Sequence, residues 1–268
     1  MFGRRADGIL IRDIGTTRRF MPFISPSRNA SLVYYSTDVE VDAALHFLDE
    51  QNAARSEDRR VTLFHLFLRS LAIALHDRPG VNRFVAGSRL WQRKEVAITY
   101  SAKQEILEGS PVLTIQRKFE RDEGLLEMVD SFRDELLARR SGRLSTADKE
   151  VNLFVNLPPF VLRAALKLLG WVDHLGLLPA SMIESDPMYA SVFVANLGSV
   201  GLDAGYHHLW DYGTCSIFAV VGQVHERHDG KRVMTVKYSY DERVEDGLYA
   251  AITLDGVRAR IEDPKQLL

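Results

Sequence analysis

Three groups that could move a proton at neutral pH stand in two short segments of this chain. Glu242 lies within Asp-Glu-Arg-Val-Glu-Asp-Gly, residues 241–247, while His207 and His208 are adjacent in residues 204–210. Imidazole titrates near neutral pH and therefore suits general acid–base chemistry. A carboxylate, with an unperturbed pKa near ~4.3, is a far weaker base toward a thiol near ~8.5, unless burial raises its pKa. These residue types predict a proton-transfer site if the fold brings the two segments together.

The composition limits which partners such a site could serve. The chain has 268 residues, of which 46% are hydrophobic and 26% charged, as in a globular protein. Its formal net charge of −2 provides no net attraction for nucleic acid or anionic lipid. The single cysteine, Cys215, excludes an intrachain disulfide and fits a reducing compartment, and we find no signal peptide. We therefore expect a cytoplasmic protein with no nucleic-acid partner and no membrane span.

Hydrophobic periodicity predicts strands and helices that share one core. Strands are expected at residues 31–42, 83–91, 96–101, 111–119, 190–195, 214–223 and 233–240, and helices at 41–58, 62–75, 124–140 and 248–262. Thr62 is expected to cap the second helix, and the Asp229-Gly230 pair marks a hairpin turn. Because there is no repeat or linker, this order favours a single α+β domain over residues 1–268.

The stretch 151–182 is more hydrophobic than the rest of the chain. Its only charged residues are Arg163, Lys167 and Asp173, yet its apolar runs are shorter than the ~20 residues of a spanning helix. The pattern predicts a helical pair that starts at Pro158 and Pro159. This pair could extend the core, form a lid, make a contact between protomers, or dock on a partner or membrane surface.

Several motifs occur in an order that resembles a known family. Residues 17–19 are Thr-Arg-Arg, residues 195–201 are Ala-Asn-Leu-Gly-Ser-Val-Gly, residues 241–247 keep Asp-x-Arg-Val-x-Asp-Gly, and residues 262–264 are Glu-Asp-Pro. Together they resemble the catalytic domain of dihydrolipoyl acyltransferases of 2-oxoacid dehydrogenase complexes, within the chloramphenicol acetyltransferase-like superfamily. The resemblance implies an α+β two-layer sandwich of a mixed sheet and helices, with 151–182 inserted. It also implies a homotrimer with active sites between subunits, and we expect no lipoyl or peripheral subunit-binding domain.

The resemblance assigns roles to individual residues. In this family a histidine takes the thiol proton of coenzyme A or dihydrolipoamide, a serine binds the oxyanion, and an aspartate pairs with an arginine. Glu242 and Ala195 stand at the histidine and serine positions, so the usual thiol acyl transfer lacks two of its groups. Asp246 and Gly247 match the structural pair, with Arg18 or Arg19 as the implied ion-pair partner. Asn196 and Gly198 match the loop that follows the serine position.

Two functions fit these residues. The first is acyl transfer from coenzyme A or an acyl-coenzyme A thioester to an unknown acceptor, through a rearranged site of Glu242, His207 or His208, and Asn196. On a strand the two histidines would point to opposite faces, so at most one would face the site. The second is a catalytically inactive homotrimer that acts as a scaffold or binding module. In either case residues 151–182 could build a higher assembly.

Other candidates for chemistry have simpler explanations. The histidine pair itself could be exposed or structurally hydrogen-bonded. His225 and His228 are expected at a solvated hairpin tip, so no metal site is predicted. Cys215 precedes an apolar run and is expected to be buried as a small apolar residue. We predict no covalently bound cofactor.

Overall fold

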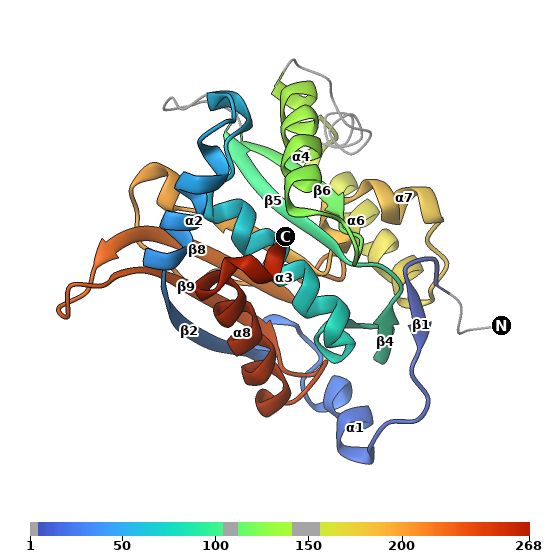
Figure 1. Cartoon of the computed structure of the whole chain (residues 1–268). Helices are drawn as coiled ribbons and strands as arrows, with labels where there is room; N and C mark the ends of the chain where they lie inside the picture. The colour runs from blue at the N-terminus through green and yellow to red at the C-terminus, as the bar shows by residue number, and fades with distance from the viewer. Residues whose placement is uncertain (1–4, 104–111, 141–155) are drawn as a thin grey trace.

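The computed structural model describes residues 5–103, 112–140 and 156–268 (Figure 1). A six-stranded mixed sheet has the order β2-β9-β8-β7-β5-β6, and a smaller sheet has the order β1-β4-β3. The strands are β1 (Gly8–Leu10), β2 (Leu32–Glu40), β3 (Arg83–Ala86), β4 (Arg89–Arg93), β5 (Ala97–Lys103), β6 (Val112–Lys118), β7 (Val192–Asn196), β8 (Ile217–Glu226) and β9 (Arg232–Asp241). The helices are α1 (Thr16–Ile24), α2 (Asp42–Asn52), α3 (Leu63–Asp77), α4 (Leu125–Arg140), α6 (Pro159–His174), α7 (Ala180–Ser185) and α8 (Gly247–Glu262).

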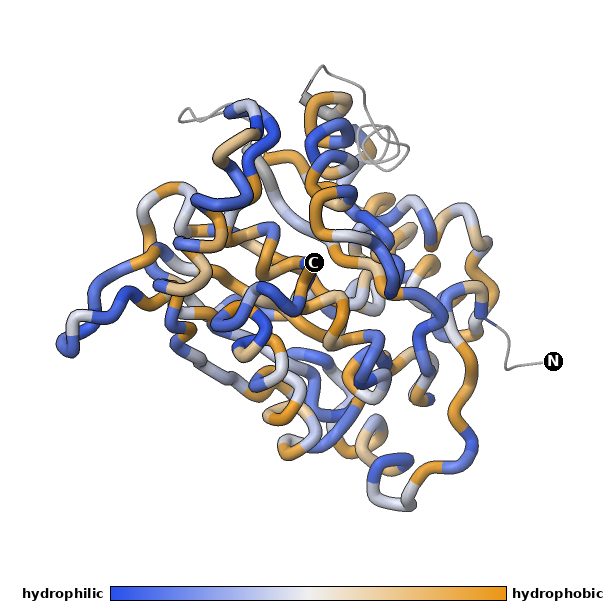
Figure 2. Tube along the Cα trace, in the orientation of Figure 1, coloured by the Kyte–Doolittle hydropathy of each residue, from blue (hydrophilic) through white to orange (hydrophobic). Residues whose placement is uncertain are grey.

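The two faces of the large sheet are covered in different ways. Helices α3 and α8 pack on one face, where the main core joins them to alternate residues of the strands, such as Val194, Ala219 and Tyr238. The other face carries a second cluster around Phe193 and Phe218, covered by the irregular segment 197–215. Hydrophobic colours dominate the central strands in Figure 2, whereas the tip between β8 and β9 is hydrophilic. The sheet therefore separates a helix-covered face from a loop-covered face.

Most of the predicted elements are present. Helix α3 begins after Thr62, whose side chain accepts from the His65 backbone N–H, and it ends at Asp77, just before Pro79. Helix α6 begins at Pro159, as the paired prolines predict, and Gly230 takes a positive φ in the turn between β8 and β9. Residue 111 and residues 151–155 of the expected elements lie outside the described residues. Within the described residues, no helix is long and apolar enough to cross a membrane.

The strand expected at 83–91 is wrong, because the chain reverses within it. Gly87 and Ser88 have φ values of 59° and 54°, so they form a tight turn that pairs Ala86 with Arg89. A Cβ on Gly87 would lie 2.3 Å from the carbonyl oxygen of His174, at the end of α6. The glycine thus lets the β3–β4 hairpin contact the end of α6. This contact joins α6 to the smaller sheet. The helix expected at 41–58 is also too long, because α2 ends at Asn52.

Gly87→Ala should destabilise the protein more than an equivalent change at Gly230. Both glycines have positive φ, so either alanine should cost about 1 kcal/mol of backbone strain, but only Gly87 is pressed against backbone atoms. We expect the free energy of unfolding to fall by about 2–4 kcal/mol for Gly87→Ala and by about 1 kcal/mol for Gly230→Ala. Urea denaturation of the two variants measures both values, and equal losses would contradict the contact between the hairpin and α6.

His65 should make stability depend on pH. Its Nδ1 accepts the Thr62 backbone N–H at 3.1 Å, and burial, followed by the charge of Arg55, lowers the pKa of His65 from 6.5 to about 4. Because the unfolded chain takes up this proton first, stability falls as the pH drops from 6.5 to 4, by on the order of 2–3 kcal/mol. His65→Gln keeps an acceptor for Thr62 but cannot titrate. Denaturation at several pH values should show a smaller pH dependence for this variant.

Candidate active site

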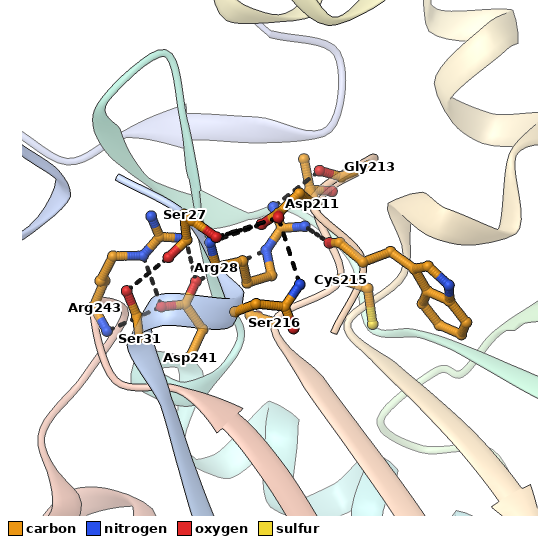
Figure 3. A network of polar contacts seen from close by, with 12 residues as sticks. Ser27, Arg28, Ser31, Asp211, Gly213, Cys215, Ser216, Asp241 and Arg243 are labelled. Carbon is orange, nitrogen blue, oxygen red and sulfur yellow. Dashed lines mark hydrogen bonds and ion pairs between the residues drawn. The ribbon is translucent and has the colours of Figure 1, made fainter. Parts of the chain in front are cut away.

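A buried ion network holds the start of segment 241–247 in place (Figure 3). The carboxylate of Asp241 accepts from Nε and Nη2 of Arg243, both at 2.8 Å, and Arg28 Nε lies 3.8 Å from the same carboxylate. All three side chains are almost fully buried. Desolvation lowers the pKa of Arg28, although the charge of Asp241 opposes the shift.

The two arginines of this network also hold distant backbone. Arg243 Nη1 donates to the carbonyl oxygens of Ser25 and Pro26, each at 3.0 Å. Arg28 donates to the carbonyls of Trp210 and Gly213. The network therefore fixes the turn after α1, the end of segment 197–215 and the end of β9 relative to one another. Arg28 had no signal in the sequence, because its partners are about 180 residues away.

Glu242 follows this network and is exposed. Its backbone N–H donates to the carbonyl of Ser31 at 3.0 Å, and its own carbonyl accepts from Arg18 Nη1. Burial first, and then the charges of Glu242 and Asp246, raise the pKa of Tyr35. The charge of Glu242 acts on Tyr35, so the two side chains lie on the same side of the sheet. Because Tyr35 packs against the main core, Glu242 lies toward the helix-covered face, at the end of β9.

Asp246 has a different role from the implied one. Its carboxylate accepts the Tyr249 backbone N–H at 2.9 Å and caps α8. Arg18 instead lies 3.9 Å from Glu245, which also pairs with Arg83, and Arg19 is exposed. The expected ion pair between Asp246 and Arg18 or Arg19 is therefore wrong for this protomer. The neighbouring Glu245 takes the arginines because the side chain of Asp246 is turned to the helix end.

The loop after β7 is built around close backbone contacts. A Cβ on Gly198 would lie 2.5 Å from the carbonyl oxygen of Gly222 on β8, so only glycine fits there. Asn196 Oδ1 accepts the Ser199 backbone N–H at 3.2 Å, which closes the turn. Ala195 packs against the loop-side cluster and has no side-chain donor. Asn196 and Gly198 therefore shape the loop.

His207 and His208 lie on the loop-covered face. The two rings stack at 4.5 Å with planes 22° apart, so the expectation of opposite faces is wrong, because residues 202–210 are not a strand. The ring of His207 also stacks on Phe218 at 4.0 Å, and its Nδ1 lies 2.7 Å from the carbonyl oxygen of His208. A carbonyl can only accept, so Nδ1 carries the proton and the lone pair is on Nε2. This arrangement presents Nε2 of His207 as a base.

Glu242 and the loop residues do not meet within one protomer. His207 packs on Phe218 on the loop side, whereas Glu242 lies at the Tyr35 side. Ala195 pairs with Val220, which pairs with Lys237, five residues before Glu242. Five residues span ~17 Å along the strand, and two strand spacings span ~10 Å across the sheet. Because these directions are perpendicular, the backbones of Ala195 and Glu242 are about 19 Å apart. A site that combines them requires two protomers.

A polar cavity of about 230 Å³ lies beside the buried network. Ser27, Arg28 and Arg243 line one side, and the turn at Gly87 lines another. Asp211 and Asp173 also line the cavity, and Asp211 accepts the Arg28 backbone N–H at 2.8 Å. The two carboxylates therefore nearly balance the two arginines around the cavity. Within the described ranges, no three histidine, cysteine, aspartate or glutamate side chains are grouped as metal ligands.

The architecture defined by this sheet, its helix-covered face and the segment at the end of β9 is that of chloramphenicol acetyltransferase-like proteins. The dihydrolipoamide acetyltransferase of Azotobacter vinelandii superposes with a TM-score of 0.63 at 16% identity, over 97% of this chain and 94% of that chain. The cubic core of a pyruvate dehydrogenase complex gives a TM-score of 0.61 at 17% identity, over 97% and 94%. Chloramphenicol acetyltransferase gives 0.56 at 13% identity, over 96% and 98%.

These likenesses show the fold that the sequence motifs predict. In sequence, no family model and no curated protein matches the chain. The similarity to the solved structures is therefore a similarity of architecture, and the chemistry has to be argued from the residues themselves.

Asp241→Asn should strongly destabilise the protein. It leaves Arg243 and Arg28 buried without their carboxylate, and breaking a buried ion pair from one side costs about 3–5 kcal/mol. Asp255→Asn, which removes an exposed pair with Arg258, is the matched control and should change stability by less than about 0.5 kcal/mol. Chemical denaturation compares the two variants, and a small effect of Asp241→Asn would show that the network does not hold these segments together.

Proposed function

We propose that this chain is an acyltransferase that acts as a homotrimer on a coenzyme A type thioester. His207 of one protomer is the general base, and Glu242 of the adjacent protomer completes the site. The observation that carries the proposal is the hydrogen bond from His207 Nδ1 to the His208 carbonyl, which fixes the tautomer with a basic Nε2. The acyltransferase-like fold supports the choice of reaction class.

The reaction needs one proton acceptor and one leaving group. Nε2 of His207 takes the proton from the thiol or amine of the acceptor, whose lone pair attacks the thioester carbon. The tetrahedral intermediate then collapses, the acceptor is acylated, and the coenzyme A thiolate leaves and takes up the proton from the imidazolium. A carboxylate close to the imidazolium stabilises its charge during this step. Glu242 of the neighbouring protomer supplies that carboxylate.

Two features support a site between protomers. The sheet separates His207 from Glu242 within one chain, so they can act together only across an interface. One structure with the same fold is the cubic core of a pyruvate dehydrogenase complex, so this architecture does self-associate. A solution mass of three times the 30.3 kDa chain would support the trimer.

A second function is favoured by a different observation. Ala195, at the position of the family's oxyanion serine, has no side-chain donor. This fact favours a trimeric scaffold that binds a thioester without turning it over. Thermal denaturation with coenzyme A and acetyl-coenzyme A tests binding, because a ligand that binds the folded state raises the melting temperature. Binding without transfer of the acyl group to any thiol or amine acceptor would establish the scaffold. An unchanged melting temperature with both ligands would exclude both functions.

His207→Ala should lower kcat by about 10²–10⁴-fold, the usual contribution of a general base. His208→Ala is the matched control, because it leaves the His208 backbone carbonyl in place and should retain activity within a few-fold. Release of free coenzyme A thiol measures both rates. If His207→Ala kept its activity, the imidazole would not be the base.

Mixed trimers test the position of the site. His207→Ala and Glu242→Ala subunits should each have strongly reduced activity alone, but together they would rebuild sites from the intact residue of each partner. Each site needs an intact His207 from one subunit and an intact Glu242 from the next, and in an equal random mixture each has a chance of about one half. Random mixing in a cyclic trimer should therefore restore about a quarter of the sites. Co-expression with two affinity tags, followed by the same assay, gives the restored fraction. Activity that stayed at the level of the single variants would place the two residues outside a common site.

A further inference from the structure

Helix α6 presents an apolar stripe that nothing in the described part of the chain covers. Phe160, Leu168 and Trp171 are exposed at 76%, 61% and 62%, and they recur with Ala164 at spacings of four and three residues. Side chains at this spacing lie on one side of a helix. None of the residues of α6 is fully buried. Leu177, just after the helix, is exposed at 60% and extends the apolar surface.

The outward charges beside this stripe are all positive. Arg163 and Lys167 are exposed, four residues apart, and have no ion-pair partner among the described residues. The one acidic residue of α6, Asp173, is turned inward and pairs with Arg5 at 2.7 Å. The chain as a whole has a net charge of −2, so this positive charge is local to the helix.

The C-terminal end of α6 is held by contacts with the N-terminal segment and with the β3–β4 turn. Arg5 binds both the carboxylate and the backbone carbonyl of Asp173, and the turn at Gly87 packs against His174. These contacts anchor the C-terminal end of the helix that carries the stripe. An amphipathic helix with Phe, Leu and Trp on one side and Lys and Arg beside them can lie in a bilayer interface.

We infer that α6 docks this protein on the surface of an anionic lipid membrane. The apolar stripe would enter the interface between headgroups and acyl chains, where tryptophan is favoured, and Arg163 and Lys167 would contact the anionic headgroups. The charge supports this occupant, because anionic headgroups complement the positive side chains of Arg163 and Lys167 beside the stripe. A contact with a second copy of the chain is the alternative outcome of the test below.

Vesicle binding by the full-length chain tests this inference. The protein should sediment with phosphatidylcholine vesicles that contain about a third phosphatidylglycerol, and much less with phosphatidylcholine alone or in high salt. Leu168→Ser with Trp171→Ser should weaken binding by about tenfold or more, and Arg163→Glu with Lys167→Glu should remove the preference for anionic lipid. Ile252→Ser, which changes an exposed apolar residue of α8, is the matched control and should bind like the original.

Tryptophan fluorescence gives an independent measurement. Trp91 is buried and Trp210 is half-buried, so the exposed Trp171 should dominate a blue shift of the emission on anionic vesicles. Trp171→Phe should abolish this blue shift while the protein still sediments with the vesicles.

Absence of sedimentation with anionic vesicles, or binding that both double variants retain, would overturn the inference. A change in oligomer mass caused by Leu168→Ser with Trp171→Ser, without vesicle binding, would assign the stripe to a second copy instead. Neither result depends on acyl transfer, so the two proposals fail separately.

Discussion

A carboxylate that water cannot reach must be neutralised by the protein, and Asp241 is such a group. Two arginines surround it, and their remaining donors reach four backbone carbonyls in the turn after α1 and in the segment at 210–213. Three parts of the chain that are far apart in sequence are therefore joined at one point. The end of β9, the position of Glu242 and the path of the loop that carries His207 all depend on this network. Removing the carboxylate would leave the two arginines buried without their counter-charge.

The sheet imposes the second constraint. Alternate residues of a strand point to opposite faces, so Phe218 and Tyr35 belong to different sides although their strands lie in one sheet. The loop-covered side holds the stacked histidines, and the helix-covered side holds Tyr35, Asp246 and the start of α8. Groups that the sequence placed in one hypothetical site are thus divided between two surfaces. Within one protomer these groups therefore form no common site.

The inserted helix α6 shows how a hydrophobic segment can be neither core nor membrane span. Its apolar residues are too few in an unbroken run to cross a bilayer, and the ion pair with Arg5 together with the β3–β4 turn fixes one end of it. What remains is an amphipathic surface whose outward charges are positive. Such a surface can attract a partner of opposite charge even though the whole chain is slightly acidic.

The sequence by itself determined the architecture. Hydrophobic periodicity and turn signals predicted an α+β domain, because these are local signals of helices, strands and their ends. The motifs at 195–201 and 241–247 predicted the acyltransferase-like fold through their resemblance to a known family. The reversal at Gly87 was missed, since an apolar run can continue through a tight turn. Only the tertiary structure decided that Arg28 supports Asp241 and that the two histidines stack on one face. The contact between Arg28 and Asp241 joins distant parts of the chain, and the stack on Phe218 depends on the path of segment 197–215, so no local pattern encodes either one. The cap by Asp246 is a local contact with Tyr249, and the fold decided only that Glu245 meets Arg18 and Arg83.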